Sequence, residues 1–295
     1  MSGVGGIGLF LVISPFLAAF MRALDAIIPL RLPGTEATEN SNPLKSCLKE
    51  PAGIFRLPWQ RGHAIRILSV LYPVLIMAAG ALAFSGSNIA ISFLLLAFGQ
   101  AIRIYVYYAY ESETLEDEPG GNSDPAGRER QIAVTAMFVC QLLLIAAGFY
   151  CFNVRIFSAG DFSVSTVVSA GIAPALYMPA MLIGLVLILV YGFAYVHTAS
   201  TFGGNEACKG AYKEAALFQI GRSYEAVTLY GVLFIMNYGG TTISAVISAA
   251  ICLSVWFLSV LFGKNRSPQP GFLILLTVSA IVLLASFVNL FVLLS

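Results

Sequence analysis

Charged residues are scarce in this sequence. Of its 295 residues, 11% are Asp, Glu, Lys or Arg and 58% are hydrophobic, whereas a soluble domain carries about 25% charged residues. The formal net charge is only +1 and no basic run is present, which excludes the charge pattern typical of nucleic-acid binding. The composition therefore predicts an all-α protein that crosses a membrane several times, with no nucleic-acid partner.

Metal-ligand patterns are also missing. The five cysteines are scattered without CxxC or Cys/His spacing, and the two histidines stand apart at the edges of apolar runs. We therefore expect no zinc or iron–sulfur site in this chain. The first apolar run has no basic segment before it and leads into Arg22 and Asp25, so we expect no cleaved signal peptide.

Eight apolar runs are long enough to cross a bilayer. They cover residues 3–24, 64–84, 88–110, 131–152, 172–196, 214–237, 241–263 and 272–294. The basic residues gather in the first, third, fifth and seventh connections, and the positive-inside rule places these in the cytoplasm. We predict one multi-pass domain over residues 1–295 in the cell membrane, with eight transmembrane helices and both termini outside.

Two connections hold further structure. Residues 153–171 are too polar to cross the membrane and too apolar to extend into the solvent. We therefore expect this segment to lie on the outer face and to form a short helix over 164–170. In the fifth run, Pro174 and Pro179 leave carbonyl groups that neighbouring helices must satisfy. In the third run, Arg103 stands near the cytoplasmic end, and we expect its side chain to extend to the membrane surface.

The densest charge is an acidic run in the predicted third loop: Glu111, Glu113, Glu116, Asp117 and Glu118. A solvated loop accounts for it. One alternative is an entrance for protons at Glu111 and Glu113. Another is the magnesium site of a stand-alone membrane enzyme of the prenyltransferase type, although such enzymes pair two Asp-rich motifs and this sequence has one, made mostly of Glu.

The sixth run carries ionisable groups inside an apolar helix. At about 100° per residue, Glu214 and Glu225 lie about 20° apart, and Arg222 precedes Glu225 at the i, i+3 spacing of a helical ion pair. A carboxylate this deep in a membrane is costly and by default suggests function. Either the pair locks the helix against its neighbours, or these groups carry charge across the membrane.

Three segments resemble one known family: SDPAGRERQI followed by LLLIAAGFY, then FSAGDFS, then TFGGNEACKGAYKEAALFQIGRSYEAVTLYGVLF. The chain resembles the proximal membrane subunit of complex I (NADH dehydrogenase subunit 1). It is more similar to the counterpart in membrane-bound energy-converting nickel–iron hydrogenases. In the third segment, the family's motif positions fall on Phe202, Gly203, Glu206, Gly210, Tyr212 and Glu214.

The sequence also departs from this family. Lys209 stands where relatives usually carry a second acidic residue, and Val139, Cys140 and Gln141 replace an acidic step in the fourth helix. The first loop lacks the Arg-rich segment that complex I places beside its quinone. A quinone-binding subunit is therefore an alternative to a hydrogenase subunit.

The resemblance implies a non-catalytic subunit without a cofactor of its own. It would couple electron transfer in a soluble arm, whose large and small subunits hold nickel–iron and iron–sulfur centres, to proton or sodium movement beside antiporter-like membrane subunits. The implied ion pathway comprises Glu206, Glu214, Gln219, Arg222 and Glu225, and the implied docking surface comprises Lys45, Lys49, Arg128 and Arg130. A stand-alone secondary transporter is a further alternative. Many such transporters are built from internal repeats, and the eight runs show no obvious repeat, which counts against this alternative.

Overall fold

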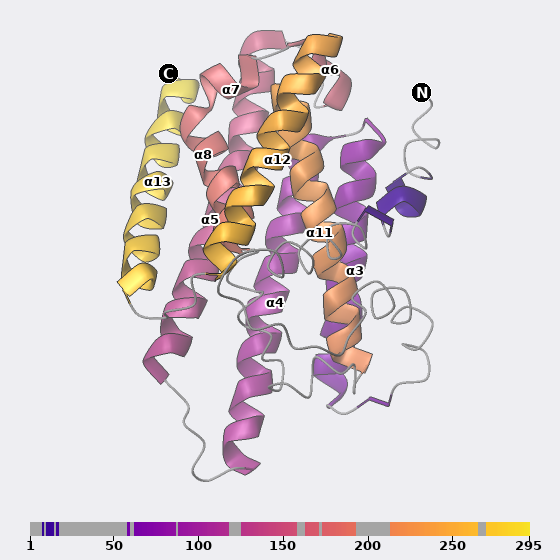
Figure 1. The fold of residues 1–295 in the computed structure, drawn as a ribbon, viewed down its shortest axis with the longest axis vertical. Helices are drawn as coiled ribbons and strands as arrows, with labels where there is room; N and C mark the ends of the chain where they lie inside the picture. The colour runs from indigo at the N-terminus through magenta and orange to yellow at the C-terminus, as the bar shows by residue number, and fades with distance from the viewer. Residues whose placement is uncertain are drawn as a thin grey trace.

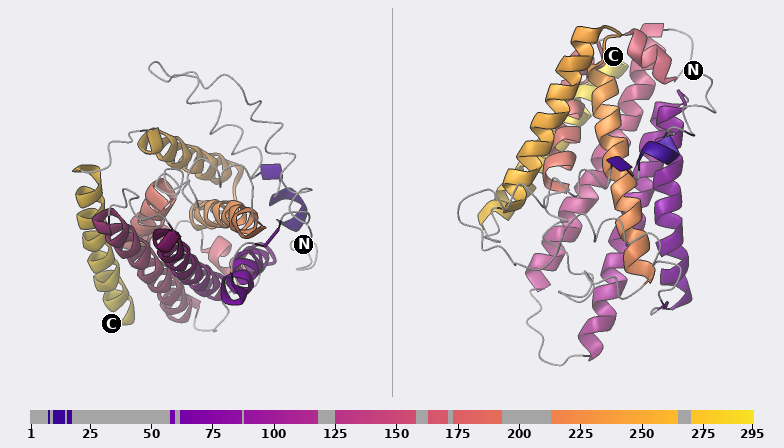
Figure 2. Two further views of the ribbon diagram at one scale, coloured as in Figure 1. Left: turned by 90° about the horizontal axis from the view of Figure 1, so that it is seen from below. Right: turned by 45° about the vertical axis from the view of Figure 1, so that its right-hand side comes forward.

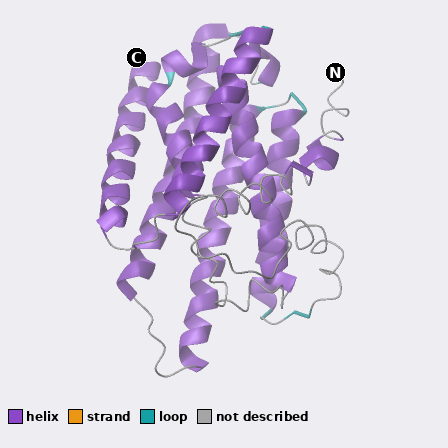
Figure 3. Cartoon of the chain, viewed as in Figure 1, coloured by secondary structure: helices purple, strands orange, loops and turns teal. Residues whose placement is uncertain are grey.

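The computed structural model describes residues 8, 10–14, 16–17, 58–59, 62–86, 88–117, 125–157, 163–170, 173–192, 213–264 and 270–295. Within these ranges the chain is helical and forms no β-strand (Figure 3). The long helices lie side by side as a bundle (Figure 1). The predicted all-α class is confirmed for this part of the chain.

Helices cover most of the described parts of the predicted apolar runs, most closely at 64–84, 241–263 and 272–294. They are α3 (His63–Phe84), α4 (Ile89–Asp117), α5 (Pro125–Phe157), α6 (Val164–Ser169), α7 (Ala173–Tyr177), α8 (Pro179–Leu187), the π-helix η2 (Ile188–Gly192), α11 (Lys213–Asn237), α12 (Thr242–Lys264) and α13 (Pro270–Leu294). The short helix expected over 164–170 is present as α6. Of the first run, 3–24, the described residues 8, 10–14 and 16–17 are helical.

Five helical segments of the described chain are long and apolar enough to cross a membrane. They are His63–Phe84, Ile89–Val106, Ile132–Arg155, Thr242–Ser259 and Ile274–Leu294. The last two, in α12 and α13, bury the smallest share of their residues in the bundle. Large apolar side chains such as Ile243 and Phe291 are exposed on these helices, as expected where lipid covers a helix.

Two tight turns join antiparallel neighbours. Gly86, at φ 78°, lies between α3 and α4, and Gly240, at φ 75°, lies between α11 and α12; both need the backbone freedom of glycine. The Asn88 side chain then caps α4 by accepting a hydrogen bond from the Ile91 amide at 3.1 Å. Thr241 caps α12 in the same way through the Ser244 amide.

The fifth run, 172–196, is not the single helix that we expected. It breaks at Met178, whose backbone leaves the helical region (φ −124°, ψ 48°), and Pro179 then starts α8. Pro179 has no N–H to continue the helix. The Tyr177 carbonyl at the end of α7 accepts a hydrogen bond from Asn289 of α13 at 2.8 Å. A neighbouring helix thus satisfies a carbonyl at the break, as the two prolines predicted.

The predicted third loop is shorter than expected. Residues 111–117 continue α4, and residues 125–130 belong to α5. Glu is a good helix former, and Pro125 stands at the first position of α5, where its missing N–H costs nothing. The lower end of α4 therefore projects beyond the rest of the bundle (Figure 1).

Helix α11 lies in the interior of the bundle, with α3, α4, α8 and α12 around it in the end-on view of Figure 2. It packs directly on α3 and α12. Its buried residues span its whole length, from Glu214 to Met236. Ionisable side chains on α11 are therefore held inside protein rather than in lipid.

Candidate functional site

Glu225 is the centre of the site. It lies near the middle of α11, and only 2% of its surface is exposed. Phe218, Gly221 and Glu225 follow one another at spacings of three and four residues, so they share one helical face. This face packs against α3, because a Cβ added at Gly221 would lie 2.5 Å from the Tyr72 ring.

Tyr72 of α3 is the first partner of this carboxylate. Its hydroxyl donates to Glu225 Oε2 at 2.7 Å, and the residue is fully buried. The Tyr72 ring stacks on Phe218, with centroids 4.9 Å apart and planes at 20°. Because Gly221 has no side chain, α11 comes close enough to α3 for this stack and this hydrogen bond to form together.

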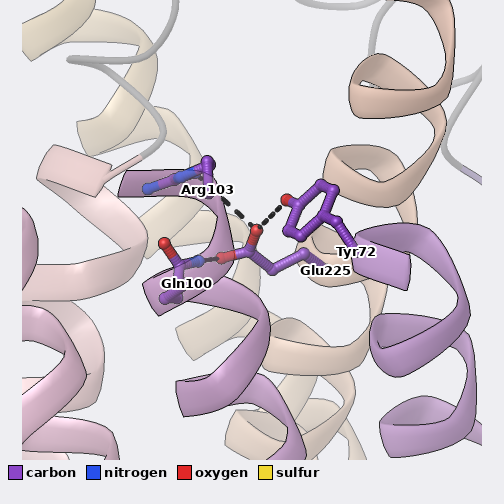
Figure 4. A network of polar contacts seen from close by, with 4 residues as sticks. All are labelled: Tyr72, Gln100, Arg103 and Glu225. Atoms are coloured by element: carbon purple, nitrogen blue, oxygen red, sulfur yellow. Dashed lines mark hydrogen bonds and ion pairs between the residues drawn. The ribbon is translucent and has the colours of Figure 1, made fainter. Parts of the chain in front are cut away.

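Two residues of α4 reach the carboxylate from the other side. Gln100 Nε2 donates to Glu225 Oε1, and Arg103 Nη1 lies 3.8 Å from Glu225 Oε2 (Figure 4). The two residues are three positions apart and therefore lie on neighbouring parts of one helix face. Glu225 thus joins three helices, α3, α4 and α11, through its two oxygens.

The three groups described above as contacting this carboxylate are hydrogen-bond donors: a phenol, a primary amide and a guanidinium. A buried carboxylate needs such partners, because an unpaired buried charge costs several kcal/mol. Gln100 Oε1 points away from Glu225 (Figure 4). It is buried and has no hydrogen-bond partner in the structure. The site therefore contains one buried hydrogen-bond acceptor without a partner, Gln100 Oε1, beside the Glu225 carboxylate, whose two oxygens both face donors.

The structure adds one partner to Glu225 and corrects one prediction about an arginine. Glu225 has an ion-pair partner on a different helix, Arg103 of α4. Arg103 does not extend to the membrane surface, since only 13% of its side chain is exposed.

The other predicted pathway residues fare differently. Glu214, which we expected at an entrance in the cytoplasmic loop, lies in the first turn of α11 and is buried with 3% of its surface exposed. Gln219 belongs to α11, but its side chain lies outside the described part of the structure, as does the whole of Glu206. The same is true of the remaining predicted entrance and docking side chains, at Glu111, Glu113, Lys45, Lys49, Arg128 and Arg130.

Sequence reasoning missed Tyr72 as a site residue and misread Arg103. Tyr72 stands in an apolar run, where a tyrosine reads as a packing or interface residue. A useful signal was present in the third run, since Gln100 and Arg103 place two polar groups on one face of an apolar helix. Such a face requires a buried partner on another helix.

The bundle holds a second polar contact apart from Glu225. Gln141 of α5 donates to Ser286 Oγ of α13 at 2.8 Å, and its side chain packs on Gly184 of α8. The contact contains no charged group. At the other end of the bundle, Lys213 lies over the Trp59 ring at 5.0 Å and its amide donates to the Pro58 carbonyl, which fixes the start of α11.

Within the described ranges, no three His, Cys, Asp or Glu side chains come together as they would around a metal ion. No family model matches this chain. No curated protein sequence matches it either. The functional conclusion therefore depends on the geometry around Glu225 and on the sequence resemblance.

Proposed function

We propose that this chain is the ion-translocating membrane subunit of a larger redox complex in the cell membrane, with Glu225 as its internal ion-carrying group. The observation that carries the proposal is a buried carboxylate held by donors from three different helices. An ionisable residue in the interior of a membrane bundle marks ion pathways and proton relays.

The geometry allows the hydrogen bonds of Glu225 to change when neighbouring helices move. Tyr72, Gln100 and Arg103 lie on α3 and α4, so a small displacement of either helix relative to α11 changes the donors around Glu225. Moving one charge through the full membrane field corresponds to about 2.3 kcal/mol per 100 mV. Gaining or losing one hydrogen bond to a charged group is worth about 1.5–3 kcal/mol. One such rearrangement is therefore of the right size to couple to ion movement.

The resemblance to the membrane subunit of energy-converting hydrogenases supplies the rest of the proposal. In this arrangement the chain spans the membrane eight times with both termini outside, and α11 forms the sixth span. Its 25 residues are long enough to cross, at about 1.5 Å each. Redox centres reside in the soluble partner subunits, which dock on Lys45, Lys49, Arg128 and Arg130. Ions enter at Glu206 and Glu214, or at Glu111 and Glu113, and reach Glu225.

Replacing the acid by its neutral isostere tests the proposal. In the purified complex, Glu225→Gln keeps a side chain of the same size that still hydrogen-bonds. We expect assembly, shown by mass spectrometry of the intact complex, and electron transfer to soluble dyes to persist. The ion gradient formed by the complex in liposomes should disappear.

The matched control is Thr228→Val, on the same helix. Thr228 is fully buried and its hydroxyl donates to the Tyr224 carbonyl of α11 itself at 2.8 Å. This change removes a buried polar group without touching the carboxylate, and we expect it to leave the gradient intact. Normal gradient formation by Glu225→Gln would rule out the proposed role.

A second candidate function is a stand-alone secondary transporter. The break between α7 and α8 at Met178, followed by the π-helix η2, favours it, because transporter sites are typically built on discontinuous helices. The purified single chain in liposomes distinguishes the two. Ion flux driven by an imposed gradient, without partner subunits, would favour the transporter, and its absence would favour the coupling subunit.

A further inference from the structure

We propose that Asn153 binds water in a buried site at the end of the bundle where α4 begins, and that the Phe93–Phe149 stack separates this site from the polar groups around Glu225. The role of such a barrier in transport rests on the proposed function. The water site and the barrier themselves follow from the contact between α4 and α5.

Asn153 of α5 is a buried amide without a hydrogen-bond partner. None of its surface is exposed, and neither its Nδ2 nor its Oδ1 is paired with any group in the described part of the chain. Leaving a buried polar group unpaired costs about 1–3 kcal/mol. Buried waters typically bind polar groups of this kind, which would otherwise be unsatisfied. The amide offers both a donor and an acceptor, so we place water there.

The level of Asn153 in the bundle follows from a pair of stacked rings. Phe149 of α5 stacks on Phe93 of α4, with centroids 5.6 Å apart and planes at 18°. Asn153 lies one turn after Phe149, and Ile89 lies one turn before Phe93. The two helices pack against each other and run in opposite directions (Figure 1). Asn153 and Ile89 therefore lie at the same level, on the side of the rings nearest the start of α4.

This level is close to an end of the bundle. An isolated β-bridge pairs Asn88, directly before α4, with Ser163, directly before α6. Helix α6 therefore begins beside the start of α4, and its Val167 is fully buried. The water site thus lies near α6 rather than in the middle of the bundle.

On the other side of the rings, the contact is apolar until it reaches Gln100. Gln100 lies seven positions after Phe93, on nearly the same face of α4, and its Oε1 has no partner in the described structure. At 1.5 Å per residue, the amides of Gln100 and Asn153 are about 16 Å apart along the bundle. The side chains between them are apolar and at most 4% exposed: Leu96, Ala97, Leu142, Ile145 and Ala146.

The stacked rings are the largest side chains in this apolar layer. Phe93 and Phe149 are both fully buried. A hydrophobic constriction blocks water and ions until it becomes wet. An amide lies on each side of the layer and can hold water, whereas the layer itself offers water no hydrogen bond. We therefore assign the barrier to the Phe93–Phe149 stack.

Cysteine labelling of the purified complex in detergent tests both parts of the proposal. Ile89→Cys and Ala97→Cys each place a thiol one turn from Phe93, on opposite sides of the rings, at positions that are 0% and 2% exposed. Methyl methanethiosulfonate is a small reagent that reacts with the thiolate, which forms where water reaches the thiol. Mass spectrometry identifies the labelled residue. In detergent both ends of the bundle are accessible, so the result does not depend on which end faces outward.

We expect label at Ile89→Cys and none at Ala97→Cys over the same time. Adding Asn153→Leu to Ile89→Cys should abolish the label, because the amide that holds the water is then absent. Label at both positions, or at neither, would overturn the proposal. Label at Ile89→Cys that persists with Asn153→Leu would overturn the water site, since water would then reach this position without the amide.

Substitutions of Phe93 test the barrier directly. Phe93→Asn places an amide in the apolar layer, so Ala97→Cys should become labelled, and liposomes that hold the complex should leak protons or sodium without an electron donor. Phe93→Leu keeps the layer apolar and should change neither result. An unlabelled Ala97→Cys and tight liposomes with Phe93→Asn would overturn the barrier. If Phe93→Asn does not assemble, the comparison of Ile89→Cys with Ala97→Cys decides the question in the unaltered stack.

Failure of this proposal and failure of the proposed function give different results. If Glu225→Gln still forms a gradient, the transport role of Glu225 fails, whereas the labelling pattern on the two sides of Phe93 is unaffected. If the two cysteines are labelled equally, the water site and barrier fail, even when the gradient depends on Glu225.

Discussion

The hydroxyl of Tyr72 and the carboxylate of Glu225 lie 153 positions apart in the sequence and 2.7 Å apart in space. This hydrogen bond joins the first described long helix, α3, to the interior helix α11. The same tyrosine ring packs on Phe218 and against Gly221. Packing and polar contact are therefore combined in one side chain, and its two contributions can be separated by substitution.

Tyr72→Phe removes the hydroxyl and keeps the ring on Phe218. The buried carboxylate loses one donor, and a hydrogen bond to a charged group is worth about 1.5–3 kcal/mol. We expect a lower midpoint of thermal unfolding in detergent and a smaller ion gradient. Tyr105→Phe is the control, because Tyr105 is exposed on α4 and should change neither quantity. Equal effects of the two substitutions would contradict a special role for Tyr72.

The sequence predicted the helices well wherever apolar length decided the outcome. The runs 64–84, 241–263 and 272–294 match α3, α12 and α13 to within two residues. The predicted helix bounds were wrong where proline, contacts between helices or helix propensity act together with hydropathy. The break at Met178 depends on Pro179 together with a hydrogen bond from Asn289, more than 100 residues away. The extension of α4 through Asp117 reflects helix propensity, which a hydropathy count does not contain.

For the site, the sequence identified the acid but not its partners. Glu225 stands out because a carboxylate in an apolar helix is rare. Its donors come from α3 and α4, and contacts between helices distant in sequence cannot be read from one chain. The expected pair with Arg222 followed the i, i+3 rule, which compares positions on one helix. In the bundle, a neighbouring helix supplies an ion-pair partner as well, Arg103 of α4.

Gly221→Ala tests the close approach of α3 and α11. The added Cβ would lie 2.5 Å from Tyr72 Cε1 and 3.1 Å from the Pro73 Cα, which is backbone and cannot rotate aside. Overpacking of this kind costs about 1–3 kcal/mol, so unfolding in detergent should occur at lower temperature. Gly62→Ala is the control, because a Cβ there meets nothing within 4 Å. If Gly221→Ala were as stable as Gly62→Ala, the two helices would be farther apart than described.

Asn289→Leu tests how the helix break is held. It removes the hydrogen bond to the Tyr177 carbonyl, and such bonds between membrane helices average about 0.6 kcal/mol, up to about 1.7. It also removes Oδ1, which is buried without a partner, so the net loss of stability should be at the low end. Hydrogen exchange should nevertheless become faster in residues 178–182. Val288→Ala, an exposed neighbour on α13, should leave exchange there unchanged.

A double-mutant cycle tests the ion pair between Arg103 and Glu225. Arg103 contacts the carboxylate and is largely buried, and removing one partner of a buried pair costs about 3–5 kcal/mol. We therefore expect Arg103→Gln to lower the midpoint of thermal unfolding in detergent. In a Glu225→Gln background, most of the Arg103→Gln effect should vanish, giving a coupling energy in the range of about 0.5–3 kcal/mol for residues in contact. A coupling close to zero would contradict the ion pair, and it would remove Arg103 from the proposed ion site.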